Sequence, residues 1–238
     1  MALRGATAIA SVSAFTAERT LSLFGLSTTF TVLPNPIDTS KFQPGTEAVI
    51  AGSILNFGSV IRKKGVLALA KAFDQMARSS ELPQLTFLGN DVKDSQTGKS
   101  TRSLILASID SRFHSRVHFI DAVPYDQVIS HIEKAAVICL PSFAEAFPMT
   151  WLEAMAMEKG LVTSDIGWAK ELMIDGETGL MVDPKEPKAL AAALEHLLEY
   201  PEQSKTMGKA ARAHLMAHFA MEALTARNIS FYNQVLKK

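Results

Sequence analysis

One segment of this chain reads Ser142-Phe143-Ala144-Glu145-Ala146-Phe147-Pro148-Met149-Thr150-Trp151-Leu152-Glu153-Ala154-Met155-Ala156. The apolar run 137–140 before it predicts a strand, and Pro148 suits the first position of a helix, where a missing N–H costs nothing. Glu145 is then expected in the loop and Glu153 inside the helix. Because a helix N-terminus attracts anions and a carboxylate accepts hydroxyl hydrogen bonds, the segment predicts a site for a pyrophosphate and for sugar hydroxyls.

Composition allows a globular chain and excludes several partners. With 238 residues and 47% hydrophobic content, the chain can bury a substantial core, in one domain with room for part of another. Lys and Arg balance Asp and Glu at 24 each, so no bulk charge attracts nucleic acid or an anionic membrane. The single Cys139 lies in an apolar run, which predicts a buried strand residue and excludes disulfides within the chain.

The sequence also carries information on where in the cell the protein is located. No apolar run approaches the ~20 residues of a membrane span. The first residues only faintly resemble a secretion signal, because serine and threonine interrupt their hydrophobic stretch. We therefore expect a cytoplasmic protein, with peripheral attachment to a membrane as the alternative.

From residue 50 onward, apolar runs alternate with segments of helical spacing, which is typical of an α/β fold with a Rossmann-like, doubly wound parallel sheet. Three further helices are expected from residue 187 to the end, with breaks near Pro201 and Phe219. The expected strands are 54–58, 85–89, 117–120, 137–140, 161–164 and 179–182, and the expected crossover helices are 66–76, 101–109, 125–134, 149–157 and 169–174.

Residues 1–45 do not fit this alternation. Residues 8–24 predict a strand and a helix, which residues 30–33 and then Pro34-Asn35-Pro36-Ile37-Asp38, a sequence typical of a turn, follow. These elements are expected to be the end of a preceding domain.

Two glutamates separated by seven residues are the signature of glycosyltransferase family 4, which this chain resembles at Glu145 and Glu153. An isolated pair at this spacing is more often two solvated helix residues, but here the loop, the proline and the helix all fall where the family has them. The resemblance implies that Glu145 lies against the transferred sugar and that Glu153 binds the ribose hydroxyls. It also implies a donor-binding backbone at Ala146, Phe147, Pro148 and Met149, although the family usually has glycine in place of Pro148.

The resemblance covers nearly the whole chain and implies the C-terminal half of a GT-B fold. Residues 1–45 would be a remnant of the N-terminal acceptor domain and the interdomain linker. Residues 46–219 would be the nucleotide-sugar-binding domain, and residues 220–238 a C-terminal helix that crosses back to the first domain. Most of the acceptor domain is expected to be missing from this chain.

A second site is expected in residues 58–65, which read GSVIRKKG and follow the first strand of this domain. Its basic residues would lie at the carboxyl end of the strand, where ligands bind such sheets. The family has Gly-Arg and then Lys-Gly here, so the resemblance assigns Gly58 to donor binding and Lys64 to neutralising the donor phosphates. Ser59 replaces the arginine, which is a bidentate phosphate clamp, and Arg62 or Lys63 is the candidate to compensate for that loss. A residue of an exposed loop is the equal alternative for Arg62 and the favoured one for Lys63.

Two further positions take their meaning from the resemblance. Val123 follows another strand end, where the family's backbone meets the nucleobase, but Asp121 replaces the usual glycine, so the base is not determined. Glu171 stands in the place of a family glutamate that would buttress the site. A glutamate on a helix surface is the equal alternative.

Other motif-like strings are discounted. Gly98-Lys99-Ser100-Thr101 echoes a P-loop but lacks the earlier glycine at the required spacing, and Ser100 is better interpreted as a helix cap. No Gly-x-Gly-x-x-Gly is present, which argues against a dinucleotide oxidoreductase. The histidines lack metal-ligand spacing and are expected at the surface, so no metal is expected.

The resemblance implies transfer of a sugar from a nucleotide diphosphate sugar to an acceptor hydroxyl, as in polysaccharide biosynthesis. Retention at the anomeric carbon is implied, without a cofactor or an enzyme nucleophile, and Glu145 and Lys64 would be the catalytic residues. The acceptor is expected to be a glycan or glycolipid. Three alternatives stay open: a non-catalytic nucleotide-sugar-binding module, a fragment that needs a partner chain or self-associates through its C-terminal helix, and a GT-B epimerase or phosphorylase.

Overall fold

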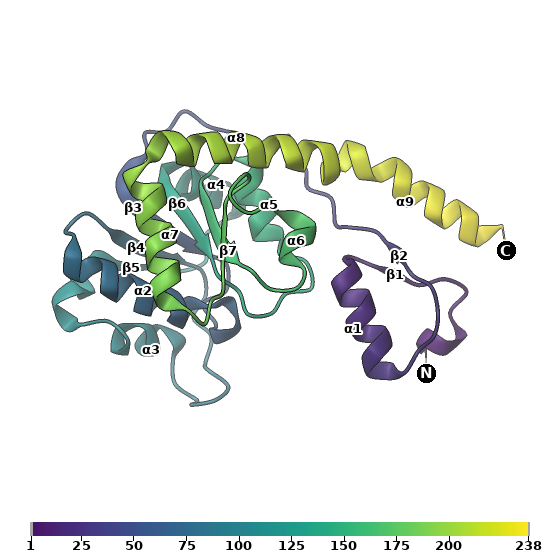
Figure 1. Cartoon of the computed structure of the whole chain (residues 1–238), viewed down its shortest axis with the longest axis horizontal. Helices are drawn as coiled ribbons and strands as arrows, with labels where there is room; N and C mark the ends of the chain where they lie inside the picture. The colour runs from purple at the N-terminus through teal and green to yellow at the C-terminus, as the bar shows by residue number, and fades with distance from the viewer. Residues whose placement is uncertain (1, 238) are drawn as a thin grey trace.

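The computed structural model describes residues 2–237, and within them the main body is a six-stranded parallel sheet with helices on both faces (Figure 1). The strands are β3 Ile50–Phe57, β4 Gln84–Leu88, β5 Val117–Ile120, β6 Ala135–Leu140, β7 Leu161–Ser164 and β8 Leu180–Val182. Their order is β5-β4-β3-β6-β7-β8, so the sheet grows outward in two directions from β3 and β6. The expected α/β fold with a doubly wound parallel sheet is confirmed.

Helices cover the sheet at the expected crossover segments, with ends that differ from the sequence prediction by a few residues. The three-helix tail after residue 187 is also confirmed. The helices are η1 Ala2–Gly5, α1 Ala14–Phe24, η2 Arg62–Lys64, α2 Val66–Ser79, α3 Thr101–Ala107, η3 Ser111–Arg116, α4 Tyr125–Lys134, α5 Met149–Ala156, α6 Ala169–Leu172, α7 Pro187–Glu199, α8 Pro201–His218 and α9 Met221–Leu236. Ser100 caps α3 as predicted, since its hydroxyl accepts from the N–H of Ser103.

Both faces of the sheet are buried because successive residues of each strand point to opposite sides. Along β6, Val137 and Cys139 face a core shared with α2, α3 and α7. Ile138 and Leu140 face a second core shared with α4, α5, α6 and α8. Cys139 is thus a buried strand residue, as predicted, and burial raises the pKa of its thiol.

β3 begins four residues earlier than the hydrophobic pattern indicates, at Ile50 and not at Ile54. Its pairing register with β6 shifts between these two residues, where Gly52 has a positive φ of 73°. A β-carbon on Gly52 would lie 2.4 Å from the carbonyl oxygen of Leu82. Glycine therefore permits an irregular start of β3, which a search for continuous apolar residues does not detect.

Residues 2–33 form a smaller unit beside the sheet, and residues 34–45 are the linker that leads from it into the sheet domain (Figure 1). Strands β1 Ala10–Ser11 and β2 Thr31–Val32 pair in parallel and flank α1. Helix α9 runs along this unit, and its Ile229 and Tyr232 line a cavity of about 580 Å³ together with residues 10–12 and 33–36.

The linker that enters the sheet domain passes the junction of α8 and α9. The N–H of Ile37 donates to the carbonyl of Phe219 at 2.9 Å, and the N–H of Met221 donates to the carbonyl of Ile37 at 3.1 Å. Ile37 and Phe219 are both buried in the core that α5 and α8 share. The chain thus passes between the N-terminal unit and the sheet domain twice, and both passages lie at this contact.

Candidate functional site

Two loops meet at the carboxyl edge of the sheet, where β3 and β6 are neighbours. The basic loop (residues 58–65) follows β3, and the glutamate loop (residues 141–148) follows β6. The order of the strands reverses between β3 and β6, and such a point forms the crevice in which doubly wound sheets bind ligands. Gly58 opens the basic loop with a φ of 107° and lies near the first turn of α5, where a β-carbon would lie 3.7 Å from Thr150.

The two loops are packed backbone against backbone. Gly65 has a φ of 74°, and a β-carbon on it would lie 1.9 Å from the carbonyl oxygen of Pro141. Beside this contact, the N–H of Phe143 donates to the carbonyl of Lys63 at 2.8 Å. Glycine at residue 65 is therefore required both by the backbone conformation and by the approach of the facing loop.

Lys64 and Glu145 meet across this contact. The Nζ atom of Lys64 lies 2.5 Å from Oε1 of Glu145, and their side chains are 21% and 11% exposed. The hydroxyl of Ser142 donates to the same Glu145 oxygen at 3.1 Å. The structure thus brings together the two residues that the sequence assigns to catalysis, in a pair that is open to the cleft on one side.

Glu153 lies one helical turn inside α5 and is buried, with 6% of its surface exposed. Burial raises the pKa of its carboxyl, while the hydroxyl of Tyr125 and the charge of Lys64 act in the opposite direction. Tyr125 donates its hydroxyl hydrogen to Oε1 of Glu153. Burial, followed by contact with Glu153, also raises the pKa of Tyr125, which stays a donor at neutral pH.

Replacing Glu153 by glutamine is expected to stabilise the fold. The raised pKa means that the folded chain holds a proton here more tightly than the unfolded chain, so the stability contribution of Glu153 falls as the pH rises above its ordinary value of 4.5. Glutamine keeps an acceptor for Tyr125 and carries no charge. We expect the unfolding midpoint of Glu153→Gln to exceed that of the wild type by roughly 2–4 °C at pH 8, which corresponds to about 1 kcal/mol in a chain of this size.

Thermal unfolding followed by circular dichroism between pH 4 and pH 8 measures this difference, which should widen with pH. Glu199→Gln, at the exposed end of α7, is the matched control and should leave the midpoint nearly unchanged. A gap that is constant across this pH range, or a destabilised Glu153→Gln variant, would contradict the prediction.

The remaining residues of the glutamate loop lead into α5. Ala146 is exposed and Phe147 is buried, with its ring 6.0 Å from that of Phe219 in an edge-to-face contact. Helix α5 begins at Met149, so Pro148 is the cap residue and not the first helical residue that the sequence predicts. Its carbonyl accepts from the N–H of Trp151 at 3.1 Å, and the earlier N–H groups, of Met149 and Thr150, have no partner within the helix.

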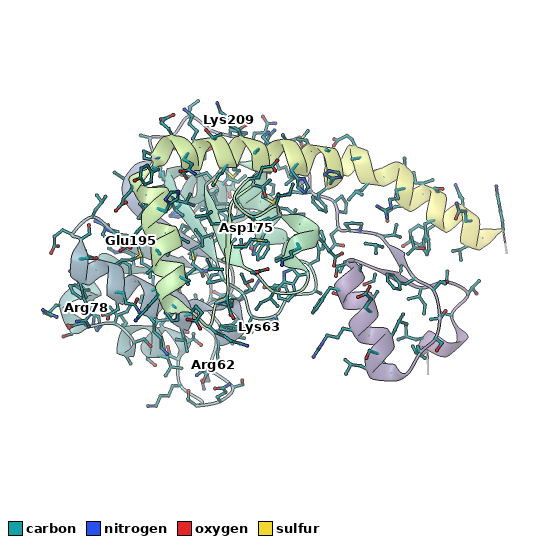
Figure 2. All side chains as sticks on the ribbon, viewed as in Figure 1. Arg62, Lys63, Arg78, Asp175, Glu195 and Lys209 are labelled. Atoms are coloured by element: carbon teal, nitrogen blue, oxygen red, sulfur yellow. The ribbon has the colours of Figure 1, made fainter. Side chains whose placement is uncertain are left out.

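Arg62 does not turn toward Glu145 and Lys64. Its guanidinium forms a two-pronged pair with Asp94, at 2.6 Å from Nε to Oδ1 and 2.9 Å from Nη2 to Oδ2. The Asp94 side chain is fully buried, and its hydrogen bonds from Arg62 hold the pKa of its carboxyl well below the usual range. Arg62 therefore fastens residues 90–100 to the basic loop, and its role in donor binding stays a prediction. Figure 2 labels Arg62 and its neighbour Lys63 on the ribbon.

Ser59 and Val123 are the other two positions that the sequence places in the site. Ser59 lies in the basic loop, directly after Gly58, and it is exposed. Val123 is partly buried after β5 and packs against the core of α4 and α5. The loop of Val123 continues into α4, and through Tyr125 it reaches Glu153, so this loop does lie beside the buried carboxylate.

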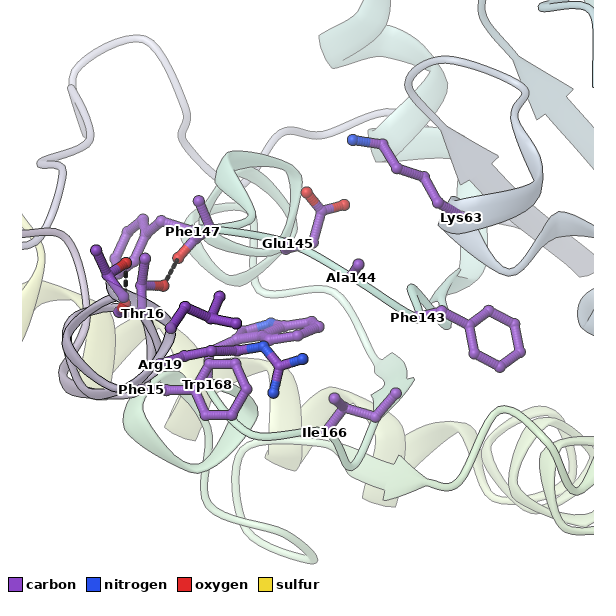
Figure 3. A pocket seen from close by; sticks show the side chains of 13 residues that line it. Phe15, Thr16, Arg19, Lys63, Phe143, Ala144, Glu145, Phe147, Ile166 and Trp168 are labelled. Carbon is purple, nitrogen blue, oxygen red and sulfur yellow. Dashed lines mark hydrogen bonds between the residues drawn. The ribbon is translucent and has the colours of Figure 1, made fainter. Parts of the chain in front are cut away.

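A cleft of about 760 Å³ lies between the glutamate loop and α1 (Figure 3). Residues from both units line it, among them Phe15 and Arg19 of α1, Lys63 of the basic loop, Glu145, and Trp168 just before α6. The rings of Phe15 and Trp168 meet edge to face at 5.9 Å. The volume lies in the range of small-molecule sites.

Glu171 anchors α1 beside this cleft, and its role in donor binding stays a prediction. Its two carboxylate oxygens accept the N–H groups of Ala14 and Phe15, at 2.7 and 2.9 Å. These are free donors of the first turn of α1, where a negative charge is also favoured by the helix dipole. Glu171 thus joins the N-terminal unit to the sheet domain.

Two kinds of feature are absent from residues 2–237. No three side chains of His, Cys, Asp or Glu gather there as a group that could hold a metal ion. Among the helices described, none combines the length and the apolar character needed to cross a membrane.

Residues 45–214 match the protein family described as "Glycosyl transferases group 1". The match covers more than half of the chain and includes both the basic loop and the glutamate loop. The chain belongs to the group 1 glycosyl transferases. The resemblance at Glu145 and Glu153 is therefore confirmed at the level of this family.

Known proteins resemble this group 1 glycosyl transferase along most of its length. The glycogen synthase of Mycobacterium tuberculosis is 27% identical over 204 residues, which are 85% of this chain and 48% of that protein. Sucrose-phosphate synthase from Thermosynechococcus elongatus matches in structure with a TM-score of 0.82 at 25% identity, over 97% of this chain and 58% of that chain. HepE from Anabaena in complex with UDP matches with a TM-score of 0.83 at 18% identity, over 97% and 65%, which shows the fold alone.

The chain spans less than two thirds of the length of the curated relatives it matches, from 29% to 59%. The activity of a whole protein is therefore a matter of proposal.

Sequence reasoning did not find four residues that shape this group 1 site. Tyr125 and Asp94 lie 28 and 32 positions from their partners Glu153 and Arg62, and no local pattern connects them. Arg19 and Trp168 enter the cleft only because α1 packs against the segment before α6.

Proposed function

We propose that this chain binds a nucleotide diphosphate sugar and takes part in transfer of the sugar to an acceptor hydroxyl, with retention at the anomeric carbon, as a member of glycosyltransferase family 4. The observation that carries the proposal is the 2.5 Å pair of Lys64 and Glu145 in the crevice between β3 and β6. Beside it lie the free N–H groups of α5 and the buried carboxylate of Glu153. Lys64 and the N–H groups of α5 suit the diphosphate, Glu145 suits the sugar, and Glu153 suits the ribose.

In this reaction the bond between the anomeric carbon and the diphosphate oxygen breaks while the acceptor oxygen bonds to the same face of that carbon. The acceptor proton passes to the departing phosphate oxygen, so no enzyme nucleophile is needed. Lys64 and the N-terminus of α5 stabilise the negative charge that grows on the phosphate. Glu145 holds the sugar hydroxyls and so fixes the alignment from which much of the acceleration comes.

The nucleoside is the part of the donor that the site leaves open. HepE was solved in complex with UDP, which supports a nucleotide donor in this fold. The two candidate nucleotides for this chain are UDP and GDP. A cytoplasmic location and a site without metal or cofactor belong to the same proposal.

Calorimetric titration of the chain with UDP, GDP and their sugar conjugates tests the proposal. One of the diphosphates is expected to bind, with an affinity that falls about 10-fold or more in Lys64→Ala and in Glu153→Ala, because each variant loses a charge-assisted contact. Lys209→Ala, on the exposed side of α8, is the matched control and should bind as the wild type does. Absence of binding by both diphosphates would overturn the proposal.

A non-catalytic nucleotide-sugar-binding module is the second candidate. It is favoured by the loss of fixed cations from the basic loop, since Ser59 stands where the family has arginine and Arg62 is occupied by Asp94. The two candidates differ in the fate of a bound donor. Slow release of free sugar or transfer to an added acceptor, followed by chromatography, identifies the enzyme, whereas a donor recovered intact identifies the module.

A further inference from the structure

The cleft between α1 and the glutamate loop has an unbalanced set of charges. Its lining carries three charged side chains, which are Arg19, Lys63 and Glu145. Figure 3 shows the amine of Lys63 and the carboxylate of Glu145 on one side and the guanidinium of Arg19 on the other, beside Trp168. Glu145 is already neutralised by Lys64 at 2.5 Å. The cleft therefore presents two positive charges in excess.

Neighbouring cations differ from these two in having partners. Arg62 pairs with Asp94 at 2.6 Å, and Arg102 pairs with Asp121 at 2.6 Å. Within residues 2–237, the side chains of Arg19 and Lys63 form no ion pair and no hydrogen bond. Their only shared surroundings are the cleft and its aromatic walls.

The position of Arg19 is fixed by the packing of its helix. Glu171 caps the first turn of α1, at 2.7 and 2.9 Å from two backbone nitrogens. The hydroxyl of Thr16 donates to the carbonyl of Ala146 at 3.3 Å, directly beside Glu145 in the chain. Phe15 fills the space over Gly167, where a β-carbon would lie 2.4 Å from its ring. The backbone of Arg19, one turn further along α1, is thus held across the cleft from the glutamate loop, and its side chain is exposed.

We propose that this cleft takes an acceptor that carries a phosphate group, and that Arg19 binds that phosphate. This inference rests on the proposed function, because the donor diphosphate belongs to Lys64 and the N-terminus of α5 on the other wall. An arginine fork matches the oxygens of a phosphate monoester with two parallel hydrogen bonds. With the phosphate on Arg19, the acceptor ring packs against Phe15 and Trp168, and its hydroxyl faces the sugar held by Glu145.

The test titrates the chain, saturated with the nucleoside diphosphate that it binds, with glucose 6-phosphate and with glucose. The phosphate probe is expected to bind at least about 10-fold more tightly than glucose, and Arg19→Gln is expected to abolish that preference. Its affinity for the diphosphate should be unchanged. Arg227→Gln, an equivalent exposed change on α9, is the control that should behave as the wild type does.

A second arm separates a free phosphate ester from a lipid headgroup of the same chemistry. Vesicles that contain phosphatidylinositol 4-phosphate, which carries a phosphate monoester on a ring with free hydroxyls, are compared with vesicles that contain phosphatidylinositol in a sedimentation assay. Binding to phosphatidylinositol 4-phosphate that is lost in Arg19→Gln supports the same phosphate contact, with the acceptor held in a membrane.

Two results would overturn the inference while leaving the proposed function in place. One is diphosphate binding by a chain that distinguishes neither glucose 6-phosphate from glucose nor the two vesicle types. The other is a loss of diphosphate affinity in Arg19→Gln, which would assign the arginine to the donor. A wild-type chain that binds no nucleoside diphosphate would overturn the proposed function itself, and the inference with it.

Discussion

Lys64→Ala is expected to lower the rate of sugar transfer or donor hydrolysis by about 100-fold or more, because a preorganised cation that meets the charge developing on the leaving group usually contributes that much. The loss has two sources in this site. The departing diphosphate loses its nearest charged partner, and Glu145 loses the amine that lies 2.5 Å from its carboxylate. Rates of sugar release from the donor, measured under saturating donor, report the effect on the chemical step.

Lys64→Arg separates these two sources. It restores the charge with a different shape, so it should recover donor affinity more than it recovers the rate. The matched control is Lys209→Ala on α8, which removes an exposed lysine far from the cleft. A Lys64→Ala variant with wild-type rate and raised KM would show that the lysine binds the donor without assisting the reaction.

Gly65→Ala is expected to destabilise the fold by about 3 kcal/mol, since strain at a positive φ and an overpacked contact each cost roughly 1–3 kcal/mol. The new β-carbon would have to lie 1.9 Å from the carbonyl oxygen of Pro141, at a φ of 74°. The opposing group is backbone, so it cannot rotate away as a side chain could. The two loops must separate, and donor affinity should fall together with stability.

Gly98→Ala provides a matched comparison. Gly98 has a φ of 70°, close to that of Gly65, but no atom lies within 4 Å of the point where its β-carbon would stand. The variant therefore isolates the conformational cost, which we expect to be about 1 kcal/mol. Urea denaturation of both variants measures the difference. Equal losses in the two variants would mean that the contact with Pro141 contributes nothing.

The sheet domain can be predicted from the sequence because its signals are local. Each strand is a short apolar run and each crossover has helical spacing, so the helix at 125–134 and the strand at 161–164 agree with the structure to the residue. The error at β3 has the same origin, since Gly52 and Ser53 interrupt the apolar run without ending the strand. Local patterns locate elements but do not resolve irregular pairing.

The site is predictable where a motif keeps its spacing, and not where a contact joins distant segments. Lys64 and Glu145 stand in separate motifs, and the switch point of the sheet brings both to one crevice. The partner of Arg62 depends on how residues 90–100 fold back, which charge and spacing do not specify. Glu171 lies 157 positions from Ala14, and no property of either residue in the sequence indicates that they meet.

The paired crossings at Ile37 and Phe219 constrain how the two units can move. A single connection would let the N-terminal unit rotate in any direction. Two stretches of chain connect it here, and they are joined by hydrogen bonds of 2.9 and 3.1 Å. The least hindered motion is therefore a hinge rotation about the line through these two stretches. The contacts that must break in such a rotation lie at the far side, where Glu171 and Thr16 hold α1. In such a rotation the residues at the mouth of the cleft move farthest, and the residues at the hinge, Ile37 and Phe219, move least.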